Sequence, residues 1–143
     1  MPQLVILYTG QLDQVVEMTS LCQQLANAMR TVKDEAGKPV FPTGGTRVLA
    51  YPAPHYAVAD GGDASLAAGG DGDYAFVYLN LRMGRGRSES AQQLAGETLV
   101  KVVKAFFSPL MATKHIGVTL QIDVGQEVFD AKHSSIHPLF NKG

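Results

Sequence analysis

The sequence lacks the residues on which several large protein classes depend. Its 143 residues include one cysteine, Cys22, and no tryptophan. A single cysteine excludes an internal disulfide framework and a cysteine-rich zinc site, and it suits a reducing compartment. We therefore expect Cys22 to serve as a small core residue.

The chain also lacks an excess of charge of either sign and any long apolar run. Twelve basic residues stand against thirteen acidic ones, a formal net charge of −1. This balance argues against nucleic acid or an anionic membrane as a partner. No apolar run approaches the roughly 18 residues of a membrane span, and the first residues carry no secretory signal. We expect a cytoplasmic protein with a single domain over residues 1–143.

Two nearly uniform apolar segments predict buried strands. PQLVILY and YAFVYLNL are apolar on both faces, which is typical of strands that are covered on both sides. A helical pattern follows each of them, over about residues 11–33 and 88–110. In the second pattern, Ser90 and Gln93 have the spacing of a capping box, which predicts the helix start.

A third and a fourth strand follow the two predicted helices. RVLAYPAPHYAVADG contains two prolines, each of which removes a ladder donor, so this segment is typical of an edge strand. IGVTLQIDV alternates between apolar and polar residues, which indicates a strand with one buried face. The chain therefore contains two strand–helix–strand units, over about residues 2–61 and 73–125, and an irregular tail from Gly125.

These units predict an α/β fold with one four-stranded mixed sheet. The right-handed crossover rule places both long helices on the same face of that sheet. Nothing remains to cover the other face, because GGDASLAAGGDGD is glycine-rich and typical of a flexible surface loop. Self-association is the economical way to cover an apolar sheet face. We therefore expect a homo-oligomer.

Pro2 is the first candidate for chemistry. Proline has no N–H to give to a sheet ladder, and the first residue of a strand is one place where it is tolerated. Methionine before a small residue is normally removed after synthesis, so Pro2 would then carry a free secondary amine. An amine held at the edge of a core is a candidate base.

Arginines form the second group of candidates. Four of the five arginines fall between residues 47 and 87: Arg47, Arg82, Arg85 and Arg87. Arg87 directly precedes the second predicted helix, whose N-terminal turn favours an anion, and a guanidinium can clamp a carboxylate. Arg82 and Arg85 are typical of solvated loop charges.

Other site classes are poorly supported by the residue patterns. Asp130, His133 and His137 have a spacing that could bind a metal, with His115 as a fourth ligand. Weak helix character and the proline after His137 favour a structural role instead, so we expect no metal site. The glycine-rich stretches GGT and GRG lack the lysine and hydroxyl of a phosphate loop.

Several motifs in order resemble the 5-carboxymethyl-2-hydroxymuconate isomerase family of the tautomerase superfamily. They are MPQLVILY, FPTGGTR, HYAVADG, DYAFVYLNLRMGRGRS and IHPLF, and the resemblance runs from Pro2 to about Phe140. It implies a homotrimer in which the bare sheet faces meet. It also implies a cofactor-free conversion of a dienol polycarboxylate to its keto form, with Pro2 as the base and Arg47 and Arg87 binding the substrate.

Physical chemistry is consistent with these implied roles, and some residues depart from the family pattern. Burial and nearby arginines lower the pKa of an amine, and the same arginines attract a polycarboxylate. Leu49 and Leu7 replace charged residues that are common in the family, and extra residues stand around 32–39 and 62–70. Two alternatives therefore stay open: another superfamily reaction on an unsaturated acid, such as decarboxylation or hydration, and a non-catalytic trimeric carboxylate-binding protein.

Overall fold

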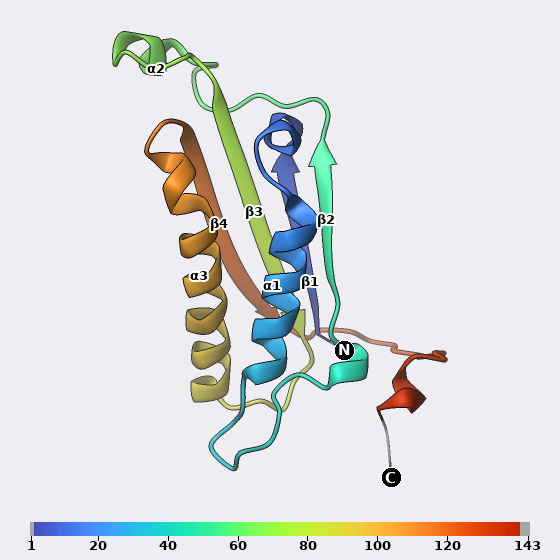
Figure 1. Cartoon of the computed structure of the whole chain (residues 1–143). Helices are drawn as coiled ribbons and strands as arrows, with labels where there is room; N and C mark the ends of the chain where they lie inside the picture. Colours follow the sequence, from blue (N-terminus) through green and yellow to red (C-terminus); the bar gives the residue numbers. More distant parts are fainter. Residues whose placement is uncertain (1, 141–143) are drawn as a thin grey trace.

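A computed structural model describes residues 2–140 as one sheet with two long helices packed on one of its faces (Figure 1). The strand order is β2-β1-β3-β4. The strands are β1 (Gln3–Thr9), β2 (Val48–Ala53), β3 (Tyr74–Met83) and β4 (His115–Val124). The helices are α1 (Met18–Thr31), the short α2 (Asp63–Ala67) and α3 (Glu89–Met111), with single-turn 3-10 helices at η1 (Gly10–Gln14), η2 (Thr43–Gly45) and η3 (His137–Leu139).

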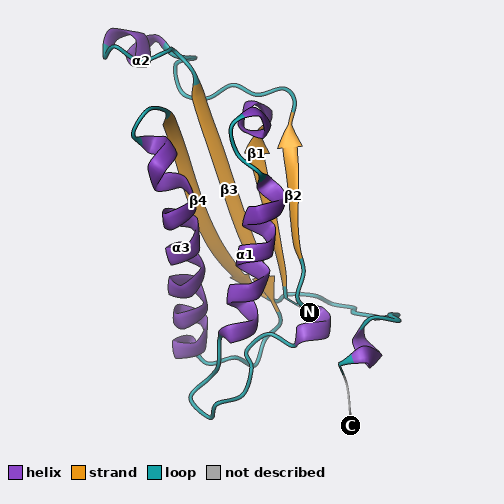
Figure 2. Ribbon diagram, in the orientation of Figure 1, coloured by secondary structure: helices purple, strands orange, loops and turns teal. Residues whose placement is uncertain are grey.

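The topology is that of two strand–helix–strand units joined along their first strands. β1 pairs in parallel with β2, β3 pairs in parallel with β4, and the two units meet through the antiparallel pair of β1 and β3. Figure 2 shows α1 and α3 on the same face of the mixed sheet. The predicted fold class is confirmed, and the proline-containing β2 is an edge strand as expected.

The core lies between the sheet and these two helices. Alternate residues of the central strands point to the helices, so each apolar segment buries only one face within the chain. The fully buried side chains include Leu4 and Ile6 of β1, Val77, Leu79 and Leu81 of β3, Leu21 and Leu25 of α1, and Leu99 and Phe107 of α3. Cys22 is partly buried and packs against this core.

The first helix starts later than the periodicity predicts. α1 begins at Met18, and residues 10–14 form the tighter η1 instead. Gly10 lies so close to β2 that a Cβ atom there would stand 2.9 Å from the Ala53 carbonyl oxygen. The chain therefore has to turn tightly at the end of β1. The three- and four-residue spacing of apolar residues in the first helical pattern predicts a buried Val15, but Val15 is 45% exposed.

The start of α3 also differs from the prediction. Ser88, and not Ser90, is the N-cap residue, and its Oγ accepts a hydrogen bond from the Ala91 N–H at 3.1 Å. Glu35 accepts hydrogen bonds from the hydroxyls of both serines. The extra residues around 32–39 therefore dock on the start of α3, and these hydrogen bonds lower the pKa of the Glu35 carboxyl.

The spacing of apolar residues in the second helical pattern predicts one buried face with Leu94, Leu99, Val102 and Phe106, and the buried face of α3 is one residue away at most of these positions. It consists of Ala91, Ala95, Leu99, Val103 and Phe107, whereas Leu94 is 43% exposed. Small alanines face the sheet near the helix start, so size as well as polarity determines which residues are buried.

The glycine-rich segment between β2 and β3, which its composition predicts to be a flexible loop, is partly helical and partly buried. It contains α2, and Ser65 within it is buried. The Ser65 Oγ lies 2.9 Å from Nδ1 of His115 and accepts a hydrogen bond from the Gly72 N–H at 3.1 Å. Composition alone did not reveal this anchor, because it depends on a histidine 50 residues further along the chain.

The sheet face opposite the helices is open, as predicted. It carries a set of exposed apolar side chains: Leu7 of β1, Leu49 and Tyr51 of β2, and Phe76 of β3. Beside them, Tyr78 donates a hydrogen bond to Gln121 and Asn80 donates one to Asp123, each at 2.9 Å. We call this surface the open face. Within residues 2–140, no helix is long and apolar enough to cross a membrane.

Replacing Ser88 with alanine should cost about 1 kcal/mol of folding stability, because the first turn of α3 loses its cap. Ser90→Ala is the matched control, since Ser90 also contacts Glu35 but does not cap the helix. Urea unfolding of both variants measures the difference. Equal losses would show that the Glu35 contact, and not the cap, stabilises this end of α3.

Candidate active site

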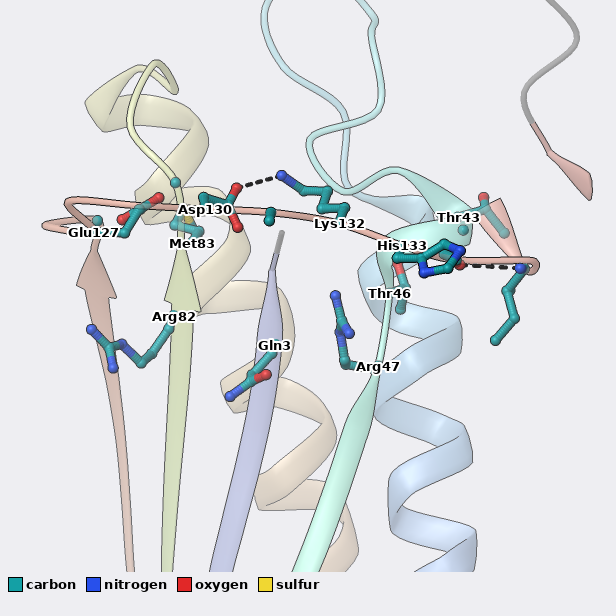
Figure 3. Close-up of a pocket in the computed structure, with 16 residues that line it drawn as sticks. Gln3, Thr43, Thr46, Arg47, Arg82, Met83, Glu127, Asp130, Lys132 and His133 are labelled. Carbon is teal, nitrogen blue, oxygen red and sulfur yellow. Dashed lines mark hydrogen bonds and ion pairs between the residues drawn. The ribbon is translucent and has the colours of Figure 1, made fainter. Parts of the chain in front are cut away.

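A pocket of about 760 Å³ lies at the end of the sheet where β1 and β2 begin and β3 and β4 end. Its floor is formed by the strand ends, and the tail after β4 crosses above it (Figure 3). The lining includes Gln3, Arg47, Arg82, Lys132 and His133. Strand starts and a crossing segment thus bring together residues that are more than a hundred positions apart in sequence.

Arg47 is positioned by the turn in FPTGGTR. The Gly45 N–H and the Thr46 hydroxyl both bond to the Pro42 carbonyl oxygen, at 3.0 Å each, which closes the turn at η2. The Arg47 carbonyl oxygen then accepts the Leu4 N–H at 3.0 Å, which ties Arg47 to the start of β1. Its Nε atom is buried and, within residues 2–140, has no hydrogen-bond partner. A buried donor of this kind is suited to an anionic ligand.

Pro2 lies at the start of β1, immediately before a pocket residue. It is buried, and Gln3, which follows it, lines the pocket. In Figure 3 the start of β1 points to the space between Arg47 and the Asp130–Lys132 pair. The structure therefore brings Pro2 and Arg47, two of the three predicted site residues, to the same end of the sheet.

Arg87, the third predicted residue, is not part of the lining of this pocket. Its Nε donates to the Val40 carbonyl oxygen at 3.0 Å, and its Nη1 donates to the Gly84 carbonyl oxygen at 3.1 Å. Desolvation lowers the pKa of this guanidinium. Arg87 lines a separate depression at the start of α3, together with Glu35 and Ser88.

Arg82 occupies a place that the sequence did not indicate. It belongs to β3, directly opposite Gln3 of β1, and it lines the pocket, so the expectation of a loop charge is wrong for Arg82. The pairing of β1 with β3 puts it there, and that pairing is not visible in the residues around Arg82. Arg85 is an exposed loop residue, as expected.

The tail contributes pocket residues that sequence reasoning missed. Lys132 pairs with Asp130, and both line the pocket with Glu127 and His133. The tail is irregular and carries no periodic signal, so its path over the strand ends could not be deduced. The only indication was that the family resemblance continues through IHPLF to the end of this segment.

The four candidate metal ligands do not come together. His115 stands at the start of β4, at the opposite end of the sheet, where it contacts Ser65. Asp130 and His133 line the pocket, and His137 belongs to η3. Among the described residues, no group of three potential metal ligands is close enough to bind one ion.

The two leucines that depart from the family pattern lie on the open face. Leu7 pairs with Tyr51, and Leu49 pairs with Val5, so the two leucines are close neighbours on adjacent strands. Neither lines the pocket. The two leucines therefore form part of the apolar surface of the open face.

The balance of charge in the pocket favours an anionic small molecule. Three cationic side chains come from three different elements: Arg47 from the turn before β2, Arg82 from β3 and Lys132 from the tail. Two carboxylates, Glu127 and Asp130, also line the pocket, and Asp130 is paired with Lys132. A ligand with several carboxylates would find separate partners around the start of β1.

Comparisons with known proteins show which family the chain resembles. The sequence model of the 5-carboxymethyl-2-hydroxymuconate isomerase family matches residues 2–140. The chain is 30% identical over 101 residues to 5-carboxymethyl-2-hydroxymuconate Delta-isomerase of Escherichia coli, over 71% of this chain and 73% of that protein.

Solved structures add similarity over the whole fold. The chain is 60% identical to a 5-carboxymethyl-2-hydroxymuconate delta-isomerase crystal structure, with a TM-score of 0.96 over 100% of this chain and 95% of that one. A fused 4-OT trimer superposes with a TM-score of 0.56 at 16% identity, over 97% of this chain and 99% of that one, which is a likeness of fold alone. The resemblance predicted from the motifs is confirmed.

Replacing Arg87 with alanine should lower the free energy of unfolding by about 1–3 kcal/mol, because two backbone carbonyl groups lose a charged donor. Its exposed neighbour gives the control, since Arg85→Ala should change stability by no more than about 0.5 kcal/mol. Thermal and urea unfolding check both values. A stable Arg87→Ala protein with weakened ligand binding would instead show that Arg87 contacts the ligand directly.

Proposed function

The chain belongs to the 5-carboxymethyl-2-hydroxymuconate isomerase family, and on that basis we propose that it converts 5-carboxymethyl-2-hydroxymuconate to its keto isomer with Pro2 as the base. The observation that carries the proposal is the buried Nε of Arg47, which has no hydrogen-bond partner within residues 2–140 and belongs to a residue tied to the start of β1. Arg47 supplies an anion-binding group at the same end of the sheet as Pro2, the residue that would carry the amine.

The reaction requires only the movement of one proton. The neutral amine of Pro2 takes the proton from the 2-hydroxyl group, so that the C2–O bond becomes a carbonyl and the diene becomes a dienolate. The electron pair then shifts along the carbon chain, the remaining double bond lies between C3 and C4, and the ammonium returns the proton to C5. Atoms and charge balance, and the base is regenerated, so no cofactor is consumed.

The surroundings of Pro2 support a neutral amine. A chain-terminal amine has a reference pKa near 8, and the secondary amine of proline is more basic, so its pKa must fall for it to act as a base. Pro2 is buried, and Arg47 lies on the neighbouring strand start. Burial and a nearby cation both disfavour the ammonium form and lower the pKa. Removal of Met1 is required, because an amide nitrogen is not basic.

Arg47 and Arg87 have different tasks in this proposal. Arg47 binds a substrate carboxylate and stabilises the charge of the dienolate as it develops. Arg87 is bonded to the carbonyl groups of Val40 and Gly84, and Gly84 lines the pocket. We therefore assign Arg87 a positioning role at the pocket wall in place of the direct contact that the resemblance implied.

We also propose that the protein is a homotrimer whose open faces meet. The exposed apolar side chains Leu7, Leu49, Tyr51 and Phe76 form a surface of the kind that assembly covers. The fused 4-OT structure that shares the fold is a trimer. Contact between copies would bury the two leucines that replace charged residues, which gives those substitutions a role in assembly.

Replacing Pro2 with alanine should reduce kcat by about 10²-fold or more, because the ring that fixes the orientation and basicity of the amine is lost. The assay follows the ultraviolet absorbance of the dienol as it disappears. Intact mass of both proteins must first show that Met1 is absent. Full activity in Pro2→Ala, or in wild-type protein that retains Met1, would exclude Pro2 as the base.

Trimer formation can be tested at Leu7. Leu7→Asp should convert a species of three times the 15.3 kDa chain mass into monomers, because a carboxylate would be buried without a partner. Val15→Asp is the matched control, since Val15 is similarly exposed but lies away from the sheet. Sedimentation velocity measures both. A wild-type monomer, or a trimer that survives Leu7→Asp, would contradict assembly through the open face.

A further inference from the structure

We propose that Lys132, which the tail carries over the pocket, binds one carboxylate of the substrate and makes the site selective for polycarboxylates. This inference rests on the proposed function for the identity of the ligand. It goes beyond that function by assigning a specificity residue to a segment that lies outside both strand–helix–strand units.

The tail is anchored on both sides of Lys132. After β4, the Gly125 N–H donates to the Met83 carbonyl oxygen at 2.7 Å. Beyond Lys132, η3 packs on the η2 turn so closely that a Cβ atom on Gly44 would lie 2.9 Å from Nδ1 of His137. The segment between these two anchors therefore has to span the pocket, and it places Lys132 above the start of β1 (Figure 3).

The close packing of η3 on the η2 turn requires a glycine at position 44. Any larger residue would push the His137 ring away from the η2 turn. The Ser134 Oγ accepts hydrogen bonds from the N–H groups of Ile136 and His137, at 3.1 and 3.2 Å, which forms the turn that leads into η3. The backbone is thus held on both sides of Lys132, at Gly125 and at the turn that leads into η3.

Lys132 is paired, but with a partner that a ligand can replace. Its Nζ bonds to a carboxylate oxygen of Asp130, and both side chains are about half exposed, 48% each. An ion pair at this exposure contributes little to stability. A substrate carboxylate can therefore take the place of Asp130 at small cost, and Asp130 keeps the ammonium directed across the pocket until then.

The three cations are arranged for a ligand with more than one carboxylate. Arg47 comes from the turn before β2 and Arg82 from the end of β3, whereas Lys132 comes from the tail above them (Figure 3). The proposed substrate has three carboxylates, two from the muconate and one from the carboxymethyl group. The competing explanation is that Lys132 only stabilises the conformation of the tail through its ion pair with Asp130. In that case, removing either residue of the pair would have the same effect on ligand binding.

The test compares two substitutions that break the same ion pair. Calorimetry with propane-1,2,3-tricarboxylate, an unreactive probe, should give about tenfold weaker binding for Lys132→Ala, the loss expected for one charge-assisted hydrogen bond. Asp130→Asn should bind the probe more tightly than wild type, because the competing carboxylate is gone. Lys132→Arg should restore binding, and Lys101→Ala, on the exposed side of α3, should change nothing.

Two results would overturn the inference. One is probe binding by Lys132→Ala within twofold of wild type. The other is equal weakening in Lys132→Ala and Asp130→Asn, which would show that the pair serves only to shape the tail. Turnover of the dienol is measured separately: a wild-type protein that binds the probe through Lys132 but does not isomerise the dienol would contradict the proposed function and leave this inference standing.

Discussion

The hydrogen bond from the Leu4 N–H to the Arg47 carbonyl oxygen is the contact on which the site depends. It starts the parallel pairing of β1 with β2. Parallel strands begin at the same edge of a sheet, so this pairing puts Pro2 and Arg47 at the same edge. The core under β1 and β2 holds that register, because a slip by one residue would move Leu4 and Ile6 to the opposite face.

The same edge of the sheet combines burial with charge. Pro2 is buried, whereas the adjoining pocket is lined by arginine and lysine side chains and is partly neutralised by two carboxylates. Burial and cations act in one direction on an amine, towards its neutral form, and the cations also attract an anionic ligand. In the proposed mechanism, one arrangement of side chains therefore lowers the pKa of the Pro2 amine and binds the anionic substrate. Glu127 and Asp130 also line the pocket, and their negative charges weaken the attraction for an anionic ligand. Asp130 is paired with Lys132.

Local patterns predicted most of the fold and only part of the site. Apolar segments, two helical periodicities and the prolines of β2 were enough to predict the sheet, its edge strand and its open face. The start of α1 could not be predicted, because it depends on the close approach of Gly10 to Ala53. The N-cap residue of α3 could not be predicted either, because Ser88 and Ser90 have the same side chain and both can cap a helix. Arg82 and Lys132 were missed because strand pairing and tail docking, which are long-range contacts, bring them to the pocket.

The proposed mechanism requires a basic amine on Pro2, at the start of β1, and a titration of that nitrogen shows whether it is present. Nitrogen-15 NMR of protein labelled at proline would follow Pro2 as the pH changes. We expect an amine signal that titrates with a pKa below that of an ordinary prolyl amine, and that shifts when a polycarboxylate binds. A signal at the position of an amide that does not titrate would contradict the account, because Pro2 could not then act as the base.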